Sequence, residues 1–297
     1  KKLIIACFTV LSANSAQAQE TGMKLWYDRP ATQWVESLPL GNGRLGAMVY
    51  GDPIHEEFQL NEETIWGGSP YNNTNPKAKE ALPQIRQLIF EGRNKEAQAL
   101  CGPNICSQTA NGMPYQTVGS LHLDFEGISS YSNYYRELDI EKAVTTTRFT
   151  AGGVTYTREA FTSFPDQLLI IRLTASEKGK LSFTARYSTP YQENITKSIS
   201  SRKELQMDGK ANDHEGIEGK VQFTALTRIE RNGGHMESVS DTLLRVRNAN
   251  SVTIYVSIGT NFINYKDISG NARKTAQTYL KNAGKNYLKA KEAHCAT

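Results

Sequence analysis

The sequence has little net charge, few histidines and, after its first residues, no long hydrophobic run. Lysine and arginine number 34 against 30 aspartates and glutamates. The basic residues are scattered, and no zinc-finger or helix-turn-helix pattern accompanies them, so no nucleic-acid partner is expected. A mean hydropathy of −0.51 excludes a membrane transporter, and no membrane span is expected. With 38% hydrophobic and 9% aromatic residues, the 297-residue chain has enough apolar material for a large core.

Common catalytic and cofactor motifs are also missing. The five histidines show no metal-ligand spacing such as H-E-x-x-H, and no G-x-S-x-G elbow is present, so neither a metal nor a cofactor is expected. Residues 41–46 do spell G-x-G-x-x-G, but a dinucleotide site requires a helix that opens at this loop. Gly51-Asp52-Pro53 follows too soon for that helix. We interpret residues 41–46 as a glycine-rich turn between two strands.

The first residues are typical of a bacterial secretory signal. Lys1 and Lys2 precede the apolar run Leu3–Leu11, and Ala16-Gln17-Ala18 is a small-x-small cleavage site. This pattern predicts a signal peptide over residues 1–18, cleavage near Ala18, and export to the periplasm or the extracellular space. A lipoprotein anchored through Cys7 is a second interpretation, although six residues leave little apolar sequence before that cysteine.

Three cysteines remain after this segment: Cys101, Cys106 and Cys295. In an oxidising compartment Cys101 and Cys106 can close a small loop as a disulfide. The alternative is two buried thiols. A metal site is not favoured, because no histidine lies near the pair.

Strand patterns dominate the middle of the chain. From Gly119 to Thr260, apolar and polar residues alternate, and turn residues such as Gly152-Gly153 and Asn232-Gly233-Gly234 separate the segments. Leu168–Ile171 is apolar at every position, which predicts a central strand covered on both faces. The chain is therefore expected to be mostly β, with a large antiparallel sandwich and short helical insertions.

Two segments have helical patterns. Asn75 can cap a helix that begins at Pro76, whose apolar face is expected to contain Ala78, Leu82, Ile85 and Ile89. Residues 271–294 predict one C-terminal helix with a narrow apolar seam and no evident partner, preceded by a linker at residues 264–270. We interpret it as the start of a connector.

Acidic pairs and tryptophans leave the chemistry open. Adjacent carboxylates in Glu56-Glu57 and Glu62-Glu63 point to opposite faces of a strand, so neither pair flanks a glycosidic bond by itself. One carboxylate from each pair can converge, but solvated strand edges are the simpler interpretation. The tryptophans all lie in the first third of the chain, and they suit either sugar stacking or core anchoring: Trp26, Trp34 and Trp66.

Several blocks together resemble the start of glycoside hydrolase family 95, chiefly α-L-fucosidases with some α-L-galactosidases. The blocks span about residues 23–265, and they are Leu25-Trp26-Tyr27-Asp28-Arg29-Pro30-Ala31, Leu38–Met48, Leu60-Asn61-Glu62-Glu63-Thr64-Ile65-Trp66-Gly67-Gly68-Ser69-Pro70, Tyr115-Gln116 with Gly119–Phe125, Tyr135–Asp139 and Thr157–Ser163 with Pro165-Asp166. The resemblance implies an amino-terminal β-supersandwich, linker helices and an (α/α)6 barrel that hydrolyses fucosylated glycans by inversion. It also implies that the catalytic residues lie in the barrel, beyond Thr297.

The resemblance suggests a division into a signal peptide at 1–18, a sandwich domain at 22–265 and the start of a helical linker at 266–297. No catalytic residue is then expected in this chain, and by itself it is expected to be inactive. The missing barrel is the implied intramolecular partner. Candidates for contact with the barrel or for the rim of its site are Asn42, Arg44, Asn61, Glu62 and Trp66. Two alternatives remain: a free-standing carbohydrate-binding sandwich, and the related sandwich domain of phosphorylase-type family 65 enzymes.

Overall fold

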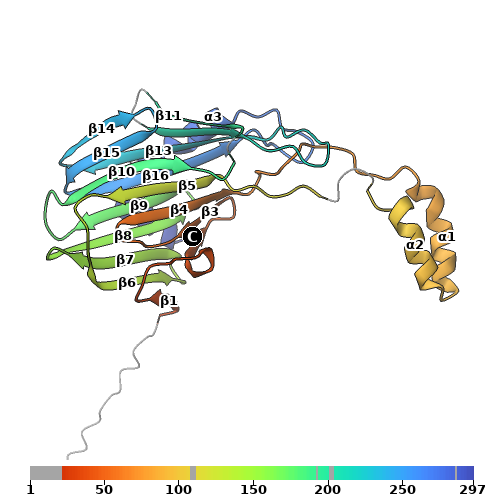
Figure 1. Cartoon of the computed structure of the whole chain (residues 1–297), viewed down its shortest axis with the longest axis horizontal. Helices are drawn as coiled ribbons and strands as arrows, with labels where there is room; N and C mark the ends of the chain where they lie inside the picture. The colour runs from red at the N-terminus through yellow and green to blue at the C-terminus, as the bar shows by residue number, and fades with distance from the viewer. Residues whose placement is uncertain (1–21, 108–111, 192, 201–203, 285) are drawn as a thin grey trace, which may run out of the picture.

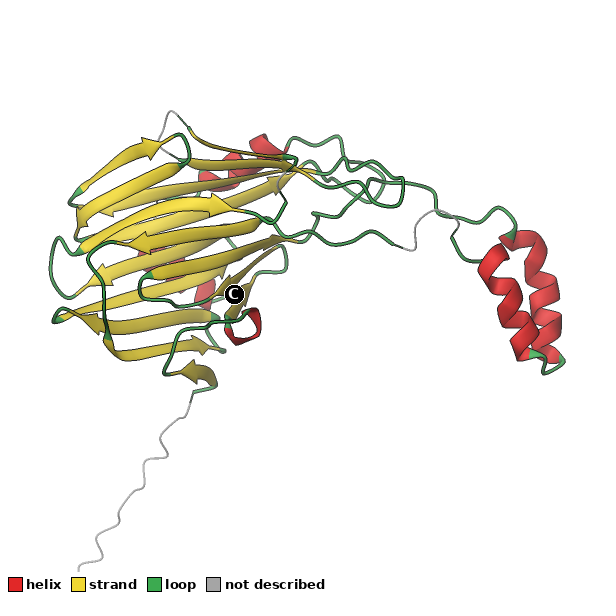
Figure 2. Cartoon of the chain, viewed as in Figure 1, coloured by secondary structure: helices red, strands yellow, loops and turns green. Residues whose placement is uncertain are grey.

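The chain folds into two large antiparallel sheets stacked face to face, with one pair of helices set apart from them (Figure 1, Figure 2). This computed structural model describes residues 22–107, 112–191, 193–200, 204–284 and 286–297. The predicted signal peptide at residues 1–18 lies outside the described residues. The prediction of a mostly β chain built on a large antiparallel sandwich is confirmed.

Every strand pair within the two sheets is antiparallel. The nine-stranded sheet has the order β1 (Lys24–Tyr27), β6 (Ser132–Asp139), β7 (Val144–Ala151), β8 (Val154–Ser163), β9 (Leu168–Ala175), β16 (Ser251–Thr260), β13 (Gln222–Asn232), β12 (Leu205–Lys210) and β11 (Ile195–Ile199). The seven-stranded sheet has the order β14 (His235–Ser240), β15 (Leu243–Ala249), β10 (Leu181–Ser188), β5 (Gly119–Phe125), β4 (His55–Glu62), β3 (Leu45–Val49) and β2 (Leu38–Gly41). A short 3-10 helix, η1 (Trp34–Glu36), connects β1 to β2.

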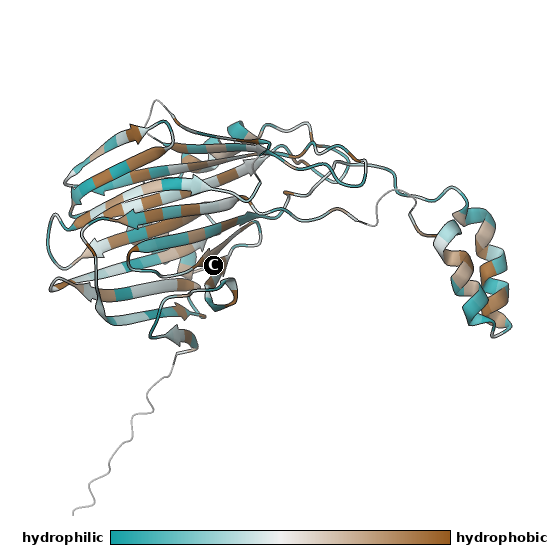
Figure 3. Ribbon diagram, viewed as in Figure 1, coloured by the Kyte–Doolittle hydropathy of each residue, from teal (hydrophilic) through white to brown (hydrophobic). Residues whose placement is uncertain are grey.

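The main core lies between the sheets, where alternate residues of each strand point inward, and Figure 3 shows the resulting banding along the strands. The middle strand of the larger sheet, β9, is buried on both faces, as its sequence predicts. Leu169 and Ile171 belong to the main core, whereas Leu168 and Ile170 belong to a second core on the outer face. An uninterrupted apolar strand thus marks the part of the sheet that is covered twice.

The predicted C-terminal helix is two helices, α3 (Ala272–Leu280) and α4 (Tyr287–Cys295), so the prediction of one continuous helix is wrong. Asn271 caps α3 by accepting a hydrogen bond from the Lys274 amide. Gly284, with φ of +86°, lies in the turn between the helices, a conformation that favours glycine.

The apolar seam of these helices has a partner, contrary to the sequence interpretation: the outer face of the nine-stranded sheet. Ala276 and Leu280 of α3 pack with Leu226 and Tyr255 of the sheet. Gly259 of β16 permits this close approach, because a Cβ atom there would lie only 2.5 Å from the Ala276 amide nitrogen. The seam is therefore buried within the described residues.

Residues 75–106 form a helical hairpin, here called the arm, with α1 (Ala78–Phe90) and α2 (Asn94–Asn104). Figure 1 shows the arm standing away from the sandwich at the end of extended loops. Asn75 does act at the start of α1, since its side-chain oxygen accepts from the Lys77 amide. The predicted buried face is rotated, however: Ile85 and Leu88 are buried, while Leu82 and Ile89 are exposed. Ile85 and Leu88 form the core of the arm with Ala97 of α2.

The two cysteines of the arm are not paired. Cys101 is half-buried, Cys106 is exposed, and both thiols are free. The disulfide that the sequence allows between them is not formed in this structure and stays a prediction.

Among the helices that the described residues form, none has the length and apolar character needed to cross a membrane.

Candidate functional site

The glycine-rich segment at residues 41–46 is the tight turn between β2 and β3, as predicted. Gly43 takes φ of +89° there, and β3 begins at Leu45, where a dinucleotide site would need a helix. Asn42 fixes the turn, because its side-chain oxygen accepts from the amides of Arg44 and Leu45 at 3.1 and 2.7 Å. Its amide nitrogen donates to the Ser163 carbonyl of β8 at 3.0 Å, which joins the two sheets.

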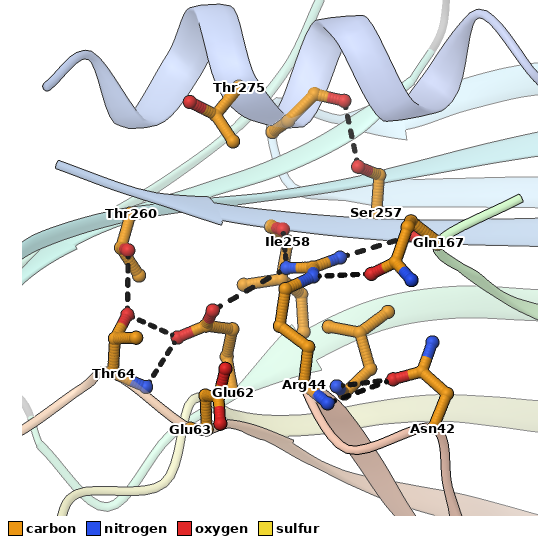
Figure 4. Close-up of polar contacts among 12 residues, drawn as sticks. Asn42, Arg44, Glu62, Glu63, Thr64, Gln167, Ser257, Ile258, Thr260 and Thr275 are labelled. Carbon is orange, nitrogen blue, oxygen red and sulfur yellow. Dashed lines mark hydrogen bonds and ion pairs between the residues drawn. The ribbon is translucent and has the colours of Figure 1, made fainter. Parts of the chain in front are cut away.

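Arg44 extends this connection from the turn to the opposite sheet (Figure 4). Its Nε donates to Gln167 Oε1 at 2.7 Å, and its Nη1 donates to the Ile258 carbonyl of β16 at 2.7 Å. The guanidinium carbon Cζ lies 4.3 Å from the centre of the Tyr279 ring in α3. One side chain therefore contacts both sheets and the first C-terminal helix.

Glu62, at the end of β4, lies beside Arg44, with 3.5 Å between Glu62 Oε1 and Arg44 Nη1. Its other oxygen accepts from the Thr64 amide at 2.8 Å and the Thr64 hydroxyl at 2.7 Å, and that hydroxyl also bonds Thr260. Burial raises the pKa of Glu62 above its usual range, and the Thr64 hydrogen bonds and the Arg44 charge oppose that rise. Asn42, Arg44 and Glu62 therefore form one network in the sandwich.

Asn61 and Trp66, the other two predicted rim residues, both contact Tyr115, whose hydroxyl also donates to the Glu62 carbonyl at 3.1 Å. The Tyr115 hydroxyl donates to Asn61 Oδ1 at 3.2 Å, and its ring meets the Trp66 ring edge-on with centroids 5.3 Å apart. Trp66 is 44% exposed. Burial, together with the charge of Glu62, raises the pKa of Tyr115 to about 12, so Tyr115 is a hydrogen-bond donor at neutral pH.

Sequence reasoning missed the partners that complete these two groups. Tyr115 belongs to one of the sequence blocks that resemble family 95. It lies 54 positions after Asn61, however, so the sequence does not indicate that the two side chains are in contact. Gln167 and Tyr279, which hold Arg44, lie still farther along and belong to a loop and a helix. The positive φ of Gln167, +58°, is a constraint that its residue type does not indicate.

A second arginine–glutamate pair closes the other end of β4. Glu56 accepts from Arg158 of β8 at 2.8 Å and from the Gly51 amide at 2.7 Å, and the side chains of Glu56 and Arg158 are 0% and 4% exposed. Arg158 also donates to the Pro53 carbonyl at 2.6 Å. The interpretation of these acidic residues as solvated strand edges is therefore wrong for Glu56 and Glu62, although Glu63 is exposed.

The geometry of β4 also excludes Glu56 and Glu62 as a catalytic pair. Both side chains point inward, but six residues of extended strand place them roughly 20 Å apart. Inverting glycosidases hold their two carboxylates about 6.5–9.5 Å apart. Each of these glutamates is engaged with its own arginine instead. Within the described ranges, no three His, Cys, Asp or Glu side chains are grouped as a metal would require.

The family follows from comparison with known proteins. Residues 25–265 match the model of the glycosyl hydrolase family 65 N-terminal domain. This chain belongs to that family of domains. The matched residues 25–265 include every described strand of the two sheets; of β1, only Lys24 lies outside the match.

Its relatives are much longer proteins. The chain is 33% identical to a protein named α-L-fucosidase 2 from Arabidopsis thaliana, with 81% of this chain and 30% of the relative covered. It is 26% identical to a protein named probable α-fucosidase A from Aspergillus oryzae, with 82% and 34% covered. The chain thus spans about a third of the length of these relatives. Together with the match to an N-terminal domain model, these relatives support the resemblance to the amino-terminal domain of a family 95 fucosidase.

The fold also occurs in a solved structure. A candidate kojibiose phosphorylase from the human microbiome superimposes with a TM-score of 0.52, at 12% identity, over 92% of this chain and 37% of that one. At this identity the likeness shows the fold alone.

Proposed function

We propose that this chain is the amino-terminal domain of an exported α-L-fucosidase that hydrolyses terminal α-L-fucosyl linkages of glycans by inversion. The observation that carries the proposal is the match of most of this chain to about a third of two proteins named as α-fucosidases. A terminal α-L-galactosyl residue is a second substrate for the same reaction. The catalytic carboxylates belong, on this proposal, to a helical barrel that follows the sandwich in the complete polypeptide.

The contacts of the sandwich support a scaffolding role for this chain. Its two buried glutamates on β4 are each committed to an arginine, and they lie too far apart to act on one bond. The Asn42–Arg44–Glu62 network connects the sheets to α3 through Tyr279. In the proposed enzyme, residues 22–265 form the scaffold, and residues 266–297 begin the linker that leads from it to the barrel.

Asn61 and Trp66 are proposed as contacts with the barrel or the rim of its site. Trp66 is exposed, and Tyr115 contacts both the Trp66 ring and the polar Asn61 side chain. An aromatic face next to an amide suits either a protein interface or the edge of a sugar site. Alanine at Asn61 and Trp66 is expected to raise the KM or lower the stability of the complete enzyme.

The test is to express the complete polypeptide and this chain side by side. We expect the complete polypeptide to hydrolyse an aryl α-L-fucoside, and the first sugar released to have inverted anomeric configuration by proton NMR. An aryl α-L-galactoside measured in parallel gives the preference. This chain alone is expected to release no product. Turnover by this chain, or phosphate-dependent cleavage by the complete protein, contradicts the proposal.

A free-standing carbohydrate-binding sandwich is the second candidate, and the exposed Trp66–Tyr115 pair favours it. Glycan binding by this chain, measured by calorimetry and abolished by Trp66→Ala, is its expected signature. An in-frame continuation of the gene into a helical barrel argues against it.

A further inference from the structure

The arm has little to hold it in place by itself. Its core consists of Ile85, Leu88 and Ala97, with Ala81, Leu100 and Cys101 packed against them, and it is separate from the cores of the sandwich. Its helices have 13 and 11 residues, near or below the length of about 12–15 at which isolated helices become stable in water. Each contains a proline, which removes an amide donor.

The apolar face of α1 extends beyond the part that α2 covers. Leu82 and Ile89, seven positions apart, lie on one side of α1 and are exposed. Ile89 is 51% exposed and Phe90, at the end of the helix, is 83% exposed. Figure 3 shows apolar stretches along the two helices of the arm, which stands clear of the sheets.

At the base of the loops that carry the arm, three chain segments, here called the stalk, are joined by hydrogen bonds: residues 67–68, 114 and 212–220. The Gly67 amide donates to the Pro114 carbonyl at 2.8 Å, and the Gly68 amide donates to the Asn212 carbonyl at 2.8 Å. Gly68 also accepts from the Lys220 amide at 3.0 Å. Three chain segments are therefore hydrogen-bonded to one another where the stalk leaves the sandwich.

An apolar hollow of about 270 Å³ lies at the base of this stalk. Trp66 and Tyr71 line it from one segment, Met113 from a second, and Phe262 and Tyr265 from the loop after β16. Its lining is mostly apolar, so a sugar placed there would leave hydroxyl groups without hydrogen-bond partners. An apolar side chain of a protein surface fits it better.

We propose that the arm is a docking element that lies against the catalytic domain of the same polypeptide, and that the hollow at its base receives an apolar side chain from that domain. The proposal rests on the proposed function, which supplies the second domain. The relatives are about three times as long as the region they share with this chain, which provides the length for such a domain. The arm lies within the span that the family model matches, residues 25–265.

A partner within the same chain is favoured over a second copy by the size of the surface. A stable dimer buries about 800 Å² on each partner, and the arm offers only a few exposed apolar side chains, chiefly Leu82, Ile89 and Phe90. A tethered partner is present at an effective concentration in the millimolar range, so a small contact suffices.

Hydrogen–deuterium exchange tests the proposal in the complete polypeptide and in this chain. We expect the amides of α1 and α2 to exchange at least about tenfold more slowly in the complete polypeptide. The double variant Ile89→Ser/Phe90→Ser, whose sites are exposed, is expected to restore the faster exchange. The control Val35→Ser, at an exposed site in η1, is expected to leave it slow.

Equal exchange rates of the arm amides in the two proteins overturn the proposal. Protection of the arm in this chain that increases with protein concentration also overturns it, because it identifies a second copy as the partner. Fucoside hydrolysis is measured on the same samples. Hydrolysis without protection removes the docking proposal and leaves the enzyme, whereas protection without hydrolysis removes the proposed activity and leaves the docking.

Discussion

Strand β4 has an arginine–glutamate pair at each end, and the surroundings of the two pairs differ. Glu56 and Arg158 are enclosed between the sheets, where the Arg158 guanidinium also lies 4.0 Å from the centre of the Phe125 ring. Arg44 and Glu62 are 17% and 3% exposed, and the Arg44 guanidinium faces the ring of Tyr279 in α3. The first pair joins sheet to sheet, and the second joins the sheets to the C-terminal helices.

The enclosed pair is therefore expected to affect the stability of the whole sandwich, and the Arg44–Glu62 pair to affect the attachment of α3 and α4 to it. A buried charge that loses its partner keeps its full desolvation cost, so damage at the enclosed pair is expected to weaken the whole domain. At the other pair, Thr64 still holds Glu62 when Arg44 is removed. Damage there is expected to act first on α3.

Loss of the Arg158 charge is expected to have the largest effect. Arg158→Met leaves Glu56 buried without its cation and leaves the Pro53 carbonyl without its donor. We expect the free energy of unfolding to fall by about 3–5 kcal/mol, measured by urea denaturation. Arg148→Met on the exposed face of β7 is the matched control and is expected to change little. A loss below about 1 kcal/mol for Arg158→Met would show that the pair is not essential to the core.

Arg44→Met is expected to cost less, about 2–3 kcal/mol, because it removes charge-assisted hydrogen bonds but keeps Glu62 on Thr64. Its distinguishing effect is local. Amide exchange in α3 is expected to accelerate more than exchange in β9, because the Tyr279 contact is lost. Uniform acceleration throughout the sandwich would remove the distinction between the two pairs.

Ser257→Ala tests the same attachment through one hydrogen bond. The Ser257 hydroxyl donates to the Ala276 carbonyl of α3 at 2.7 Å, in a fully buried position. Its loss is expected to lower the free energy of unfolding by about 1 kcal/mol. Ser198→Ala on the edge strand β11 serves as the control. An unchanged melting temperature for Ser257→Ala would show that apolar packing alone holds α3.

The sequence predicts those parts of the fold that depend on local pattern. Alternation identifies the strands, and the apolar run at Leu168–Ile171 identifies the doubly covered strand β9. It does not identify the partner of the C-terminal seam, because local pattern does not show that the outer face of the sheet, with Leu226 of β13 and Tyr255 of β16, lies under the helices. The break near Gly284 was also missed, because the apolar repeat continues across it.

The sequence predicts which residues belong to the candidate site, but it does not predict which of them contact one another. Adjacent residues Asn61 and Glu62 lie on opposite faces of β4, so one joins Tyr115 at the surface and the other joins Arg44 inside. Because glutamate side chains are seldom buried, the sequence favours solvent exposure for Glu56 and Glu62. Their arginine partners lie 102 and 18 positions away, and only the stacking of the sheets brings the first of them close.

The smallest expected effect is a pH dependence that belongs to Glu62. Burial raises its pKa in the folded chain above the ordinary value of 4.5, so the folded state binds this proton more tightly than the unfolded state does. The free energy of unfolding must then fall as pH rises from the unfolded pKa through the folded pKa. Glu62→Gln has no proton to release, and its amide oxygen still accepts from Thr64. The stability of this variant relative to the natural chain, measured by thermal unfolding, is therefore expected to increase as the pH rises above about 4.5. Glu56 contributes a slope of the same sign to both proteins and cancels in the comparison. Glu63→Gln, at the exposed neighbouring position, is expected to show no such trend, and a relative stability of Glu62→Gln that decreases with pH would mean that Arg44 and Thr64 outweigh burial at this carboxyl group.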